Sequence, residues 1–459
     1  MINRFLTAEF YDPPPRPERI YARIDQIEPL PEPRGEAGPE MPERGRRRIL
    51  FDSVDANWFD ENRRGEYDDR AYFAEISLAV LEIDVGPSFS EALGGINHVG
   101  PEEESRDDAS WFEIYLADRD MGGSPAVIYR NLFVAGEDVV VMKAVQVPQD
   151  VQALLEDAFA LEDIYEATPE EIEATLARIG TIKHAAVYDV GQGNCNGFCG
   201  PYGGVSAYYD LGGGILGNRG TFPSALSRFC FTSNPPIILS HWDWDHWSSA
   251  NRDPRALART WIVPRQSLGA VHRAFAANVI ALGRLLVWPR AVPDVQSGQV
   301  RMLRCNGNGK NHSGLAVILD GPGKYAGQHM LFPGDARYSV IPQYKNFDYT
   351  AVVAPHHGAD MRNRYAPPCP GQNHCRLAYS YGPGNSFSHA FDITRNDHQK
   401  SGWLDPAAPL YTSGSSLVRE TENRSAQSNL GHIMLRWDVR HPMPQLPCQG
   451  NCDLSICQL

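Results

Sequence analysis

Pro236-Ile-Ile-Leu-Ser240 followed by His241-Trp-Asp-Trp-Asp-His246 is the stretch that decides how this chain is interpreted. The apolar run predicts a short buried strand, and two imidazoles and two carboxylates follow it directly. Zinc, manganese and iron accept these ligand types in proteins. Four of them within six residues let one loop serve two ions, with the first His and Asp facing one ion and the second pair facing the other. Tryptophans interleaved with the ligands argue against a solvated loop.

Three later segments supply the ligands that this loop lacks. Each adjoins a strand-like run, and any one of them alone is weak, because Gly-Asp is a common turn and a single His is usually an ordinary polar residue. Together they place His and Asp at several strand ends, which predicts a layered α/β scaffold with its site along one sheet edge. The segments are Asn311-His312-Ser313, Gly334-Asp335 and Pro355-His356-His357-Gly358.

The order of these motifs resembles the metallo-β-lactamase superfamily, and most closely its ComEC-like competence-protein branch. The resemblance covers about residues 183–389. It rests on Asp189-Val-Gly-Gln-Gly193, on the His241–His246 loop, on the three later segments, and on Tyr379–His389, in which Phe387 and Ser388 replace the branch's Tyr and Gly.

This resemblance implies an α/β fold, the αβ/βα metallo-β-lactamase sandwich, with two divalent metal ions (zinc or manganese) between its halves. Asp189 is expected to orient the site, either through its side chain or through its backbone turn. The membrane helices of the competence protein have no counterpart here, so DNA uptake is not implied. Carried across by motif, the ligands are His241, Asp243 and His312 for one ion, Asp245, His246 and His356 or His357 for the other, and Asp335 as the bridge.

A pair of ions about 3.5–4 Å apart activates a water molecule and stabilises the oxyanion that its attack forms. We therefore expect a metal-dependent hydrolase, a phosphodiesterase or nuclease, with Asp245 and His389 as catalytic residues. His389 would protonate the leaving group or bind phosphate, and its alternative is a structural role. Lys310 and Arg337 are candidates for substrate binding, or they are ordinary surface charges.

Charge differs sharply between the two parts of the chain. Residues 1–180 hold 17 Lys and Arg against 39 Asp and Glu, a net charge of −22, whereas residues 181–459 hold 25 against 17, a net charge of +8. A basic second part favours a polyanionic substrate such as nucleic acid. The acidic first part would shield that site or dock a protein partner, unless it serves solubility alone. Trp242, Trp244 and Trp247 would stack bases or pack in the core.

Other functions are compatible with the same motifs. The superfamily's site also hydrolyses lactams, thioesters and other esters, so the fold does not choose the substrate. A non-enzymatic module within a multi-protein assembly, stabilised by its metal ions, is a further alternative.

Composition along the chain predicts four segments. Residues 1–48 are rich in Pro, Arg and Glu and are expected to form an extended arm. Residues 49–148 predict an acidic, β-rich accessory domain, and 149–180 a helical connector whose second helix begins at Thr168-Pro-Glu-Glu171. The remaining segment, 181–459, would be the hydrolase domain.

No apolar run approaches the roughly 20 residues that span a bilayer, and Met1–Pro15 contains no apolar signal core. We therefore expect a cytoplasmic protein without membrane contact. Its nine cysteines are irregularly spaced, which argues against a disulfide framework. A structural zinc site or incidental thiols remain open for two small groups, Cys448, Cys452 and Cys457 in the one and Cys369, His374 and Cys375 in the other.

Overall fold

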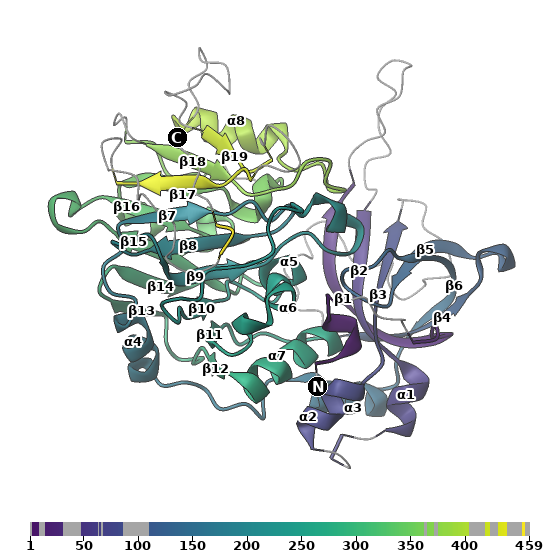
Figure 1. Ribbon diagram of the computed structural model, residues 1–459. Helices are drawn as coiled ribbons and strands as arrows, with labels where there is room; N and C mark the ends of the chain where they lie inside the picture. Colours follow the sequence, from purple (N-terminus) through teal and green to yellow (C-terminus); the bar gives the residue numbers. More distant parts are fainter. Residues whose placement is uncertain are drawn as a thin grey trace, which may run out of the picture. The chain divides into compact units, whose positions relative to one another are not determined.

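The computed structural model describes residues 2–8, 14–30, 47–62, 64–65, 68–85, 110–361, 365–370, 375–403, 418–422, 430–437 and 452–454. The chain divides into two compact units, which are described one at a time (Figure 1). The first contains Met1–Asp163 together with Ser267–Ala281, and the second contains Ile164–Gln266 and Leu282–Leu459.

The first unit is built around a closed antiparallel β-barrel. Its six strands follow one another around the barrel in the order β1-β2-β3-β5-β6-β4, and β4 pairs with β1 to close it. Alternate residues of these strands, among them Phe51, Leu81 and Ile114, form the apolar interior. The strands are β1 (Arg19–Pro29), β2 (Arg47–Asp55), β3 (Leu78–Val85), β4 (Trp111–Ala117), β5 (Ser124–Tyr129) and β6 (Glu137–Gln146).

Helices accompany the barrel within this unit, and a barrel residue caps one of them. The Asp52 carboxylate, on β2, accepts hydrogen bonds from the backbone N–H groups of Val271 (2.8 Å) and His272 (3.3 Å) in the first turn of α7. The helices are α1 (Ala56–Glu61), α2 (Asp69–Glu75), α3 (Gln149–Phe159) and α7 (Ala270–Leu282), with 3-10 turns η1 (Arg4–Leu6) and η4 (Arg119–Met121).

The arm expected for residues 1–48 differs from the structure, because Arg19–Pro29 is barrel strand β1. The segment is flanked on both sides by many Pro, Glu and Arg residues, which make its short apolar alternation difficult to recognise. Pairing with β2 and β4 stabilises the strand, and local composition does not indicate that pairing. The segment 149–180 also divides, since α3 belongs to the first unit and α4 (Pro169–Ala177) to the second.

The second unit contains two seven-stranded mixed sheets flanked by helices. In the first sheet the order is β12-β11-β10-β9-β8-β7-β20, and in the second it is β13-β14-β15-β16-β17-β18-β19. The strands of the first are β7 (His184–Val187), β8 (Cys195–Cys199), β9 (Val205–Leu211), β10 (Ile237–Ile238), β11 (Thr260–Val263), β12 (Arg284–Val287) and β20 (Ile433–Arg436). Those of the second are β13 (Asp294–Ser297), β14 (Val300–Arg304), β15 (Leu315–Asp320), β16 (His329–Phe332), β17 (Tyr349–Val353), β18 (Arg376–Tyr379) and β19 (Val418–Glu420).

One hydrophobic core joins the facing surfaces of the two sheets. Ile238 and Ile262 of the first sheet belong to the same buried cluster as Val317 and Val353 of the second. The alternate residues of the second sheet, such as Ile318, enter a separate cluster on its other face. A sheet that is apolar on both faces is buried on both faces, which is why its strands are continuous apolar runs.

The helices of the second unit are short. The capping box predicted at Thr168 is confirmed, since its side chain accepts from Glu171 N and the Glu171 side chain accepts from Thr168 N. The helices are α4, α5 (Trp244–Trp247), α6 (Ser249–Arg252) and α8 (Asp392–Lys400). The 3-10 turns are η5 (Leu216–Thr221), η6 (Pro254–Ala256), η7 (Gly323–Tyr325), η8 (Tyr338–Val340), η9 (Tyr344–Asn346) and η10 (Pro355–Gly358).

Among the residues that the structure describes, no helix has the length and apolar character needed to cross a membrane.

Candidate metal centre

The ligand-rich loop begins where β10 ends and turns directly into α5. Ser240 N donates to the Asp210 carboxylate (2.7 Å), which holds the loop against the end of β9. Asp243 then caps α5, accepting from Trp244 N at 2.7 Å. Because Asp245 and His246 lie in the first turn of that helix, they point differently from His241 and Asp243, which precede it.

The three tryptophans of this segment form part of the core. Trp242, Trp244 and Trp247 are at most 2% exposed, and the Trp242 indole donates to Pro264 O (2.9 Å). Core packing therefore holds for these rings, and base stacking on them is ruled out in this conformation. Their burial stabilises the loop that presents the ligands.

Two groups of buried ligand atoms share His246. His241, His246 and Asp335 form one group, and Asp245, His246 and His357 form the other; within each group the ligand atoms lie within 4.8 Å of one another. His246 Nε2 lies 3.1 Å from Asp335 Oδ1, and His357 Nε2 lies 3.2 Å from Asp245 Oδ2. Neighbouring ligand atoms on an ion with bonds of about 2.0–2.2 Å are separated by about 3–3.5 Å. The ligand atoms within each group are therefore close enough to bind the same cation.

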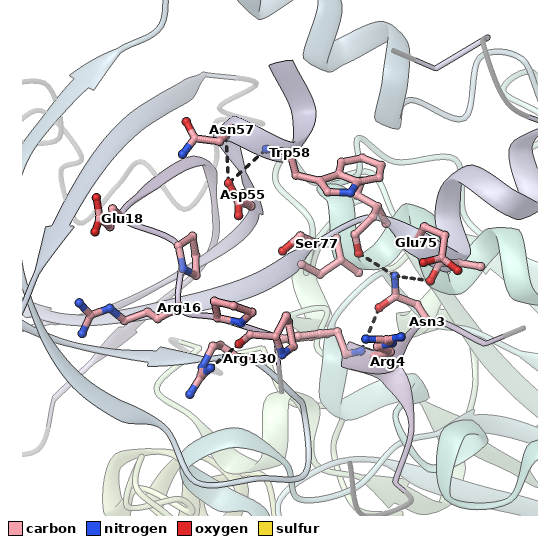
Figure 2. A pocket seen from close by; sticks show the side chains of 17 residues that line it. Asn3, Arg4, Arg16, Glu18, Asp55, Asn57, Trp58, Glu75, Ser77 and Arg130 are labelled. Carbon is pink, nitrogen blue, oxygen red and sulfur yellow. Dashed lines mark hydrogen bonds between the residues drawn. The ribbon is translucent and has the colours of Figure 1, made fainter. Parts of the chain in front are cut away.

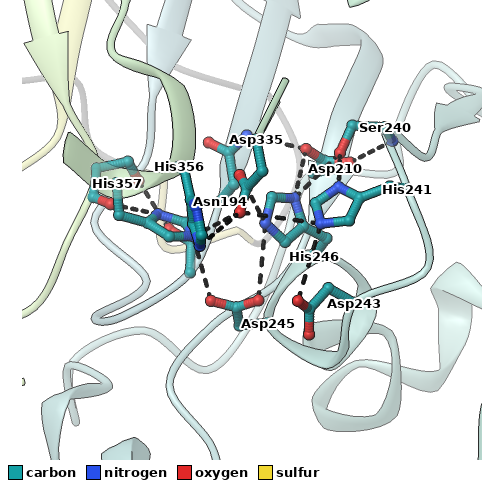
Figure 3. A network of polar contacts seen from close by, with 12 residues as sticks. Asn194, Asp210, Ser240, His241, Asp243, Asp245, His246, Asp335, His356 and His357 are labelled. Carbon is teal, nitrogen blue, oxygen red and sulfur yellow. Dashed lines mark hydrogen bonds and ion pairs between the residues drawn. The ribbon is translucent and has the colours of Figure 1, made fainter. Parts of the chain in front are cut away.

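Asp335 stands between the groups with both oxygens engaged, as Figure 3 shows. Oδ1 faces His246, whereas Oδ2 lies 3.8 Å from His241 Nε2, 3.5 Å from His356 Nε2 and 3.8 Å from His357 Nε2. A carboxylate in this position can bridge two ions, one on each oxygen.

Hydrogen bonds on the far side of two imidazoles orient them toward the centre. His357 Nδ1 donates to Ser380 O (2.7 Å), and His246 Nδ1 donates to Asp210 Oδ2 (2.9 Å). Both acceptors lack a proton to give, so the Nδ1 atoms carry the hydrogens and the Nε2 atoms face the ligand groups. This carboxylate–histidine arrangement is the usual support of a metal-binding imidazole.

Asp210 is a residue of the site that the sequence did not reveal. It is fully buried, and besides His246 and Ser240 it accepts from Asn194 Nδ2 at 2.9 Å. Its only signal is its place at the end of the strand-like run Ala207-Tyr-Tyr-Asp-Leu211, a position common to the other site residues.

Charges within the cluster support one another. Burial alone would raise the pKa of Asp335, but the surrounding histidines, His246 first, hold that pKa well below its ordinary value. Burial would lower the pKa of His246 as well, yet the Asp335 and Asp210 carboxylates raise it well above its usual range. Burial lowers the pKa of His241 to about 3, with the charges of His246 and Lys310 acting in the same direction. A metal ion bound between these side chains would replace the proton on His246, because an imidazole must lose its proton before it binds a metal.

Five ligand atoms in the centre form no well-aligned hydrogen bond with the described residues, and their nearest polar neighbours are one another. Orphaned polar atoms in a protein interior are rare and require a reason. Here a divalent cation supplies that reason, because imidazole nitrogens and carboxylate oxygens both bind such ions. The atoms are His241 Nε2, Asp245 Oδ1, His246 Nε2, Asp335 Oδ1 and His357 Nε2.

Backbone strain concentrates around the same centre. His356 (φ 48°), His357 (φ 54°), Asp210 (φ 61°) and Ser388 (φ 61°) all adopt the left-handed region. Non-glycine residues in this region cost of order 1–3 kcal/mol each and persist where the surroundings enforce them, typically at functional sites.

Other predicted ligands lie at the margin of the two groups. Asp243 Oδ2 is 3.8 Å from His241 Nε2, and His356 Nε2 is 3.5 Å from Asp335 Oδ2. His312 is buried close by, where burial and the charges of Arg337 and His356 lower its pKa to about 4. No ligand group among the described residues includes His312.

The remaining predicted residues lie around the centre. The Lys310 side chain is half-buried, 5.8 Å from the Trp244 ring, and Arg337 is half-buried beside His312. The His389 ring lies 5.7 Å from that of His356 and 6.1 Å from that of His357. The Asp189 carboxylate accepts hydrogen bonds from Gly191 N (3.2 Å) and Gly431 N (3.0 Å).

A third group, Asp25, Asp52 and His272 in the first unit, also meets the distance requirement for an ion. Its atoms already have other roles, because Asp52 caps α7 and His272 Nε2 lies 2.7 Å from Asp25 Oδ1. We interpret the hydrogen bonds of this group as the contacts that hold α7 against the barrel.

The first unit also carries a hollow of about 480 Å³, and Figure 2 shows the residues that line it. Arg4, Arg16 and Arg130 contribute positive charge, whereas Glu18 and Glu75 are among the carboxylates that balance it. This lining gives no preference for an anionic ligand, and none of the predicted site residues belongs to it.

No cysteine of the described residues belongs to a ligand group of the centre. Cys195 and Cys199 are buried and form no disulfide, and burial raises the pKa of the Cys199 thiol to about 12. Of the two groups considered for structural zinc, His374, Cys448 and Cys457 lie outside the described residues.

No protein-family model matches this chain, and a comparison with curated proteins finds no match either. What the fold and site define is an α/β protein with a six-stranded barrel, two mixed sheets and buried His/Asp groups that could hold metal ions.

Proposed function

We propose that the second unit is a hydrolase of the metallo-β-lactamase type, with two divalent ions and a phosphodiester substrate. The observation that carries this proposal is the convergence of four histidines on Asp335: Oδ1 lies 3.1 Å from His246 Nε2, and Oδ2 lies 3.5–3.8 Å from Nε2 of His241, His356 and His357. One imidazole nitrogen binds one ion, so His246 Nε2 would serve a single ion, and Asp335, whose two oxygens face different histidines, would bridge to the second.

The fold supports the proposal. Two mixed sheets share one core, and the ligands come from segments that follow β10, β16 and β17, strands of both sheets. This is the arrangement expected of the αβ/βα sandwich, whose metal ions lie at one edge between its halves.

When bound, two such ions lower the pKa of a shared water molecule and neutralise the charge that develops on the phosphoryl oxygens. The chain's own residues orient that chemistry. Asp210 and Ser380 O hold His246 and His357 in the tautomer that ligates, and Asp335 sets the spacing of the two groups. Asp245 Oδ1 lies 3.6 Å from His246 Nε2 and Oδ2 lies 3.2 Å from His357 Nε2, so Asp245 would hold an ion together with these histidines and orient the water that the ion activates.

Positive charge near the ligand groups favours an anionic substrate. Lys310 lies close enough to His241 to lower its pKa, after burial and His246, and Arg337 acts similarly on His312. Both cations would pair with phosphate oxygens of a substrate bound at the centre. They favour a phosphodiester, in a nucleic acid or nucleotide, over a neutral ester or lactam.

Metal analysis coupled to a cleavage screen tests the proposal. The full chain would be loaded with manganese or zinc and assayed on bis(p-nitrophenyl) phosphate, single- and double-stranded nucleic acids, and a panel of esters and lactams. We expect about two ions per chain and phosphodiester cleavage that falls at least 100-fold in Asp245→Ala, because the variant loses a ligand of the group that Asp245 forms with His246 and His357.

Asp392→Ala, an exposed carboxylate in the first turn of α8, is the matched control and should keep both properties. Full metal occupancy without turnover on any substrate would refute the hydrolase and favour a metal-stabilised interaction module. Turnover on esters or lactams alone would refute the phosphodiester assignment.

A further inference from the structure

Gln192 belongs to the Asp189–Gly193 turn, and nothing in the proposed chemistry uses its side chain. It is 1% exposed, and its backbone N–H donates to Thr221 Oγ1 at 2.8 Å. Thr221 Oγ1 in turn donates to Asn218 O (2.7 Å). The turn is therefore held in place, and it aims the Gln192 amide at one imidazole: Gln192 Nε2 lies 3.2 Å from His389 Nδ1.

His389 is held equally firmly. The Asn385 side chain forms two hydrogen bonds with the backbone of His389: Oδ1 accepts from His389 N, and Nδ2 donates to His389 O, each at 2.9 Å. The rings of Phe387 and Phe391 lie 5.6 and 5.4 Å from the imidazole. The contact between Gln192 and His389 thus joins two rigid elements and fixes the orientation of the ring.

The contact with the Gln192 amide favours the neutral form of His389. An amide N–H that donates to Nδ1 needs a ring nitrogen without hydrogen, which a doubly protonated imidazole does not offer. A neutral imidazole has one nitrogen that donates and one that accepts. The partner on Nδ1 therefore decides which nitrogen carries the hydrogen.

We propose that Gln192 is a positioning residue: its amide N–H donates to His389 Nδ1, so the hydrogen resides on Nε2 and His389 acts as a neutral hydrogen-bond donor to a phosphoryl oxygen. This inference rests on the proposed phosphodiester substrate. It replaces protonation of the leaving group, because no proton leaves the imidazole and no charge is created in the buried ring. Catalysis by such a donor stabilises charge on the oxyanion.

The orientation of the Gln192 amide follows from the number of its polar atoms that each orientation leaves without a hydrogen bond. With Nε2 toward His389, one amide hydrogen and the carbonyl oxygen of Gln192 have no hydrogen bond among the described residues. The reverse orientation would leave both amide hydrogens without one, and a buried N–H without an acceptor is rarer than a buried carbonyl without a donor.

Nuclear magnetic resonance of the zinc-loaded full chain tests the tautomer without any turnover. Long-range ¹H–¹⁵N spectra of ¹⁵N-histidine protein separate protonated from unprotonated ring nitrogens, and His389→Ala assigns the signals. We expect hydrogen on Nε2 in the parent protein. Gln192→Glu should move it to Nδ1, because a carboxylate only accepts, and Gln192→Met should abolish the preference for one tautomer.

Hydrogen on Nδ1 in the parent protein overturns the proposal, whether or not any variant folds. An unchanged tautomer in a folded Gln192→Glu protein with full zinc content overturns it too. Because these spectra require no substrate, they remain decisive if the protein proves inactive on phosphodiesters, and that outcome would refute the proposed function alone.

Kinetics distinguish a donor from an acid. A neutral donor helps all substrates alike, so His389→Ala and Gln192→Glu should each reduce kcat by about 10²–10³ for aryl phosphodiesters with good and with poor leaving groups. A general acid would matter far more for the poor leaving group. A loss confined to the poor leaving group, at unchanged metal content, would refute the donor role.

Discussion

Asp210→Asn tests the support of the metal centre most sharply, because one atom changes while the shape is kept. Asp210 Oδ2 accepts from both His246 Nδ1 and Asn194 Nδ2, each at 2.9 Å, and Oδ1 accepts from Ser240 N at 2.7 Å. An asparagine that keeps its oxygen on Ser240 N turns its NH2 group toward two donors. His246 would then have to accept on Nδ1, which places the hydrogen on Nε2, the atom that faces Asp335.

The size of the effect follows from these contacts. Loss of a carboxylate that orients a ligating histidine weakens metal binding about 10–100-fold. That factor corresponds to about 1.4–2.7 kcal/mol of binding free energy. In the metal-free protein the opposed buried donors should cost about 1–3 kcal/mol of unfolding free energy.

Competitive titration with a chromophoric chelator measures the zinc affinity, and thermal unfolding with and without zinc measures the stability. Asp253→Asn is the matched control: Asp253 is also buried, accepting from Phe229 N and pairing with Arg255, but it touches no ligand group. It should lower stability and leave zinc affinity unchanged. A folded Asp210→Asn protein that binds zinc as tightly as the parent would refute the carboxylate–histidine reasoning.

Two further outcomes concern stability. Gly212→Ala would place a Cβ 1.5 Å from Asp245 O, so we expect a loss of about 1–3 kcal/mol and reduced metal content, whereas Gly220→Ala, with open space, should be neutral in both assays. Burial raises the pKa of Asp52 from 3.8 to about 6. The folded state therefore binds this proton more tightly, and stability should fall by about 3 kcal/mol as pH rises from about 4 to 6. Urea unfolding of Asp52→Asn should lack that decline, and an identical decline would contradict it.

Local sequence patterns were sufficient to predict the elements whose structure depends only on residues close together in the chain. The capping box at Thr168 needs only residues three apart, and it forms as predicted. The ligand-bearing loop after Ile237–Ile238 is likewise encoded within one short segment, since a buried strand must end before polar ligands can begin. The ligand types of the His241–His246 loop, and their order before Asp335 and His357, were therefore readable from the chain.

The sequence did not reveal how those ligands are arranged in space. Whether His356 or His357 faces Asp245 depends on two consecutive left-handed residues and on Ser380 O, 23 residues beyond His357. Strand β1 within a Pro- and Glu-rich segment depends on its two barrel partners. Likewise, α7 lies in the first unit because Asp52, more than 200 residues earlier, caps it.

Sequence alone thus determined which side chains can bind cations and that they stand at strand ends, since composition and periodicity are properties of short segments. Only the tertiary structure decided which of them converge, that Asp210 supports His246, and that Gln192 meets His389. The physical reason is that a metal centre is made of contacts between distant segments, whose distances are set by how the two sheets pack on their common core.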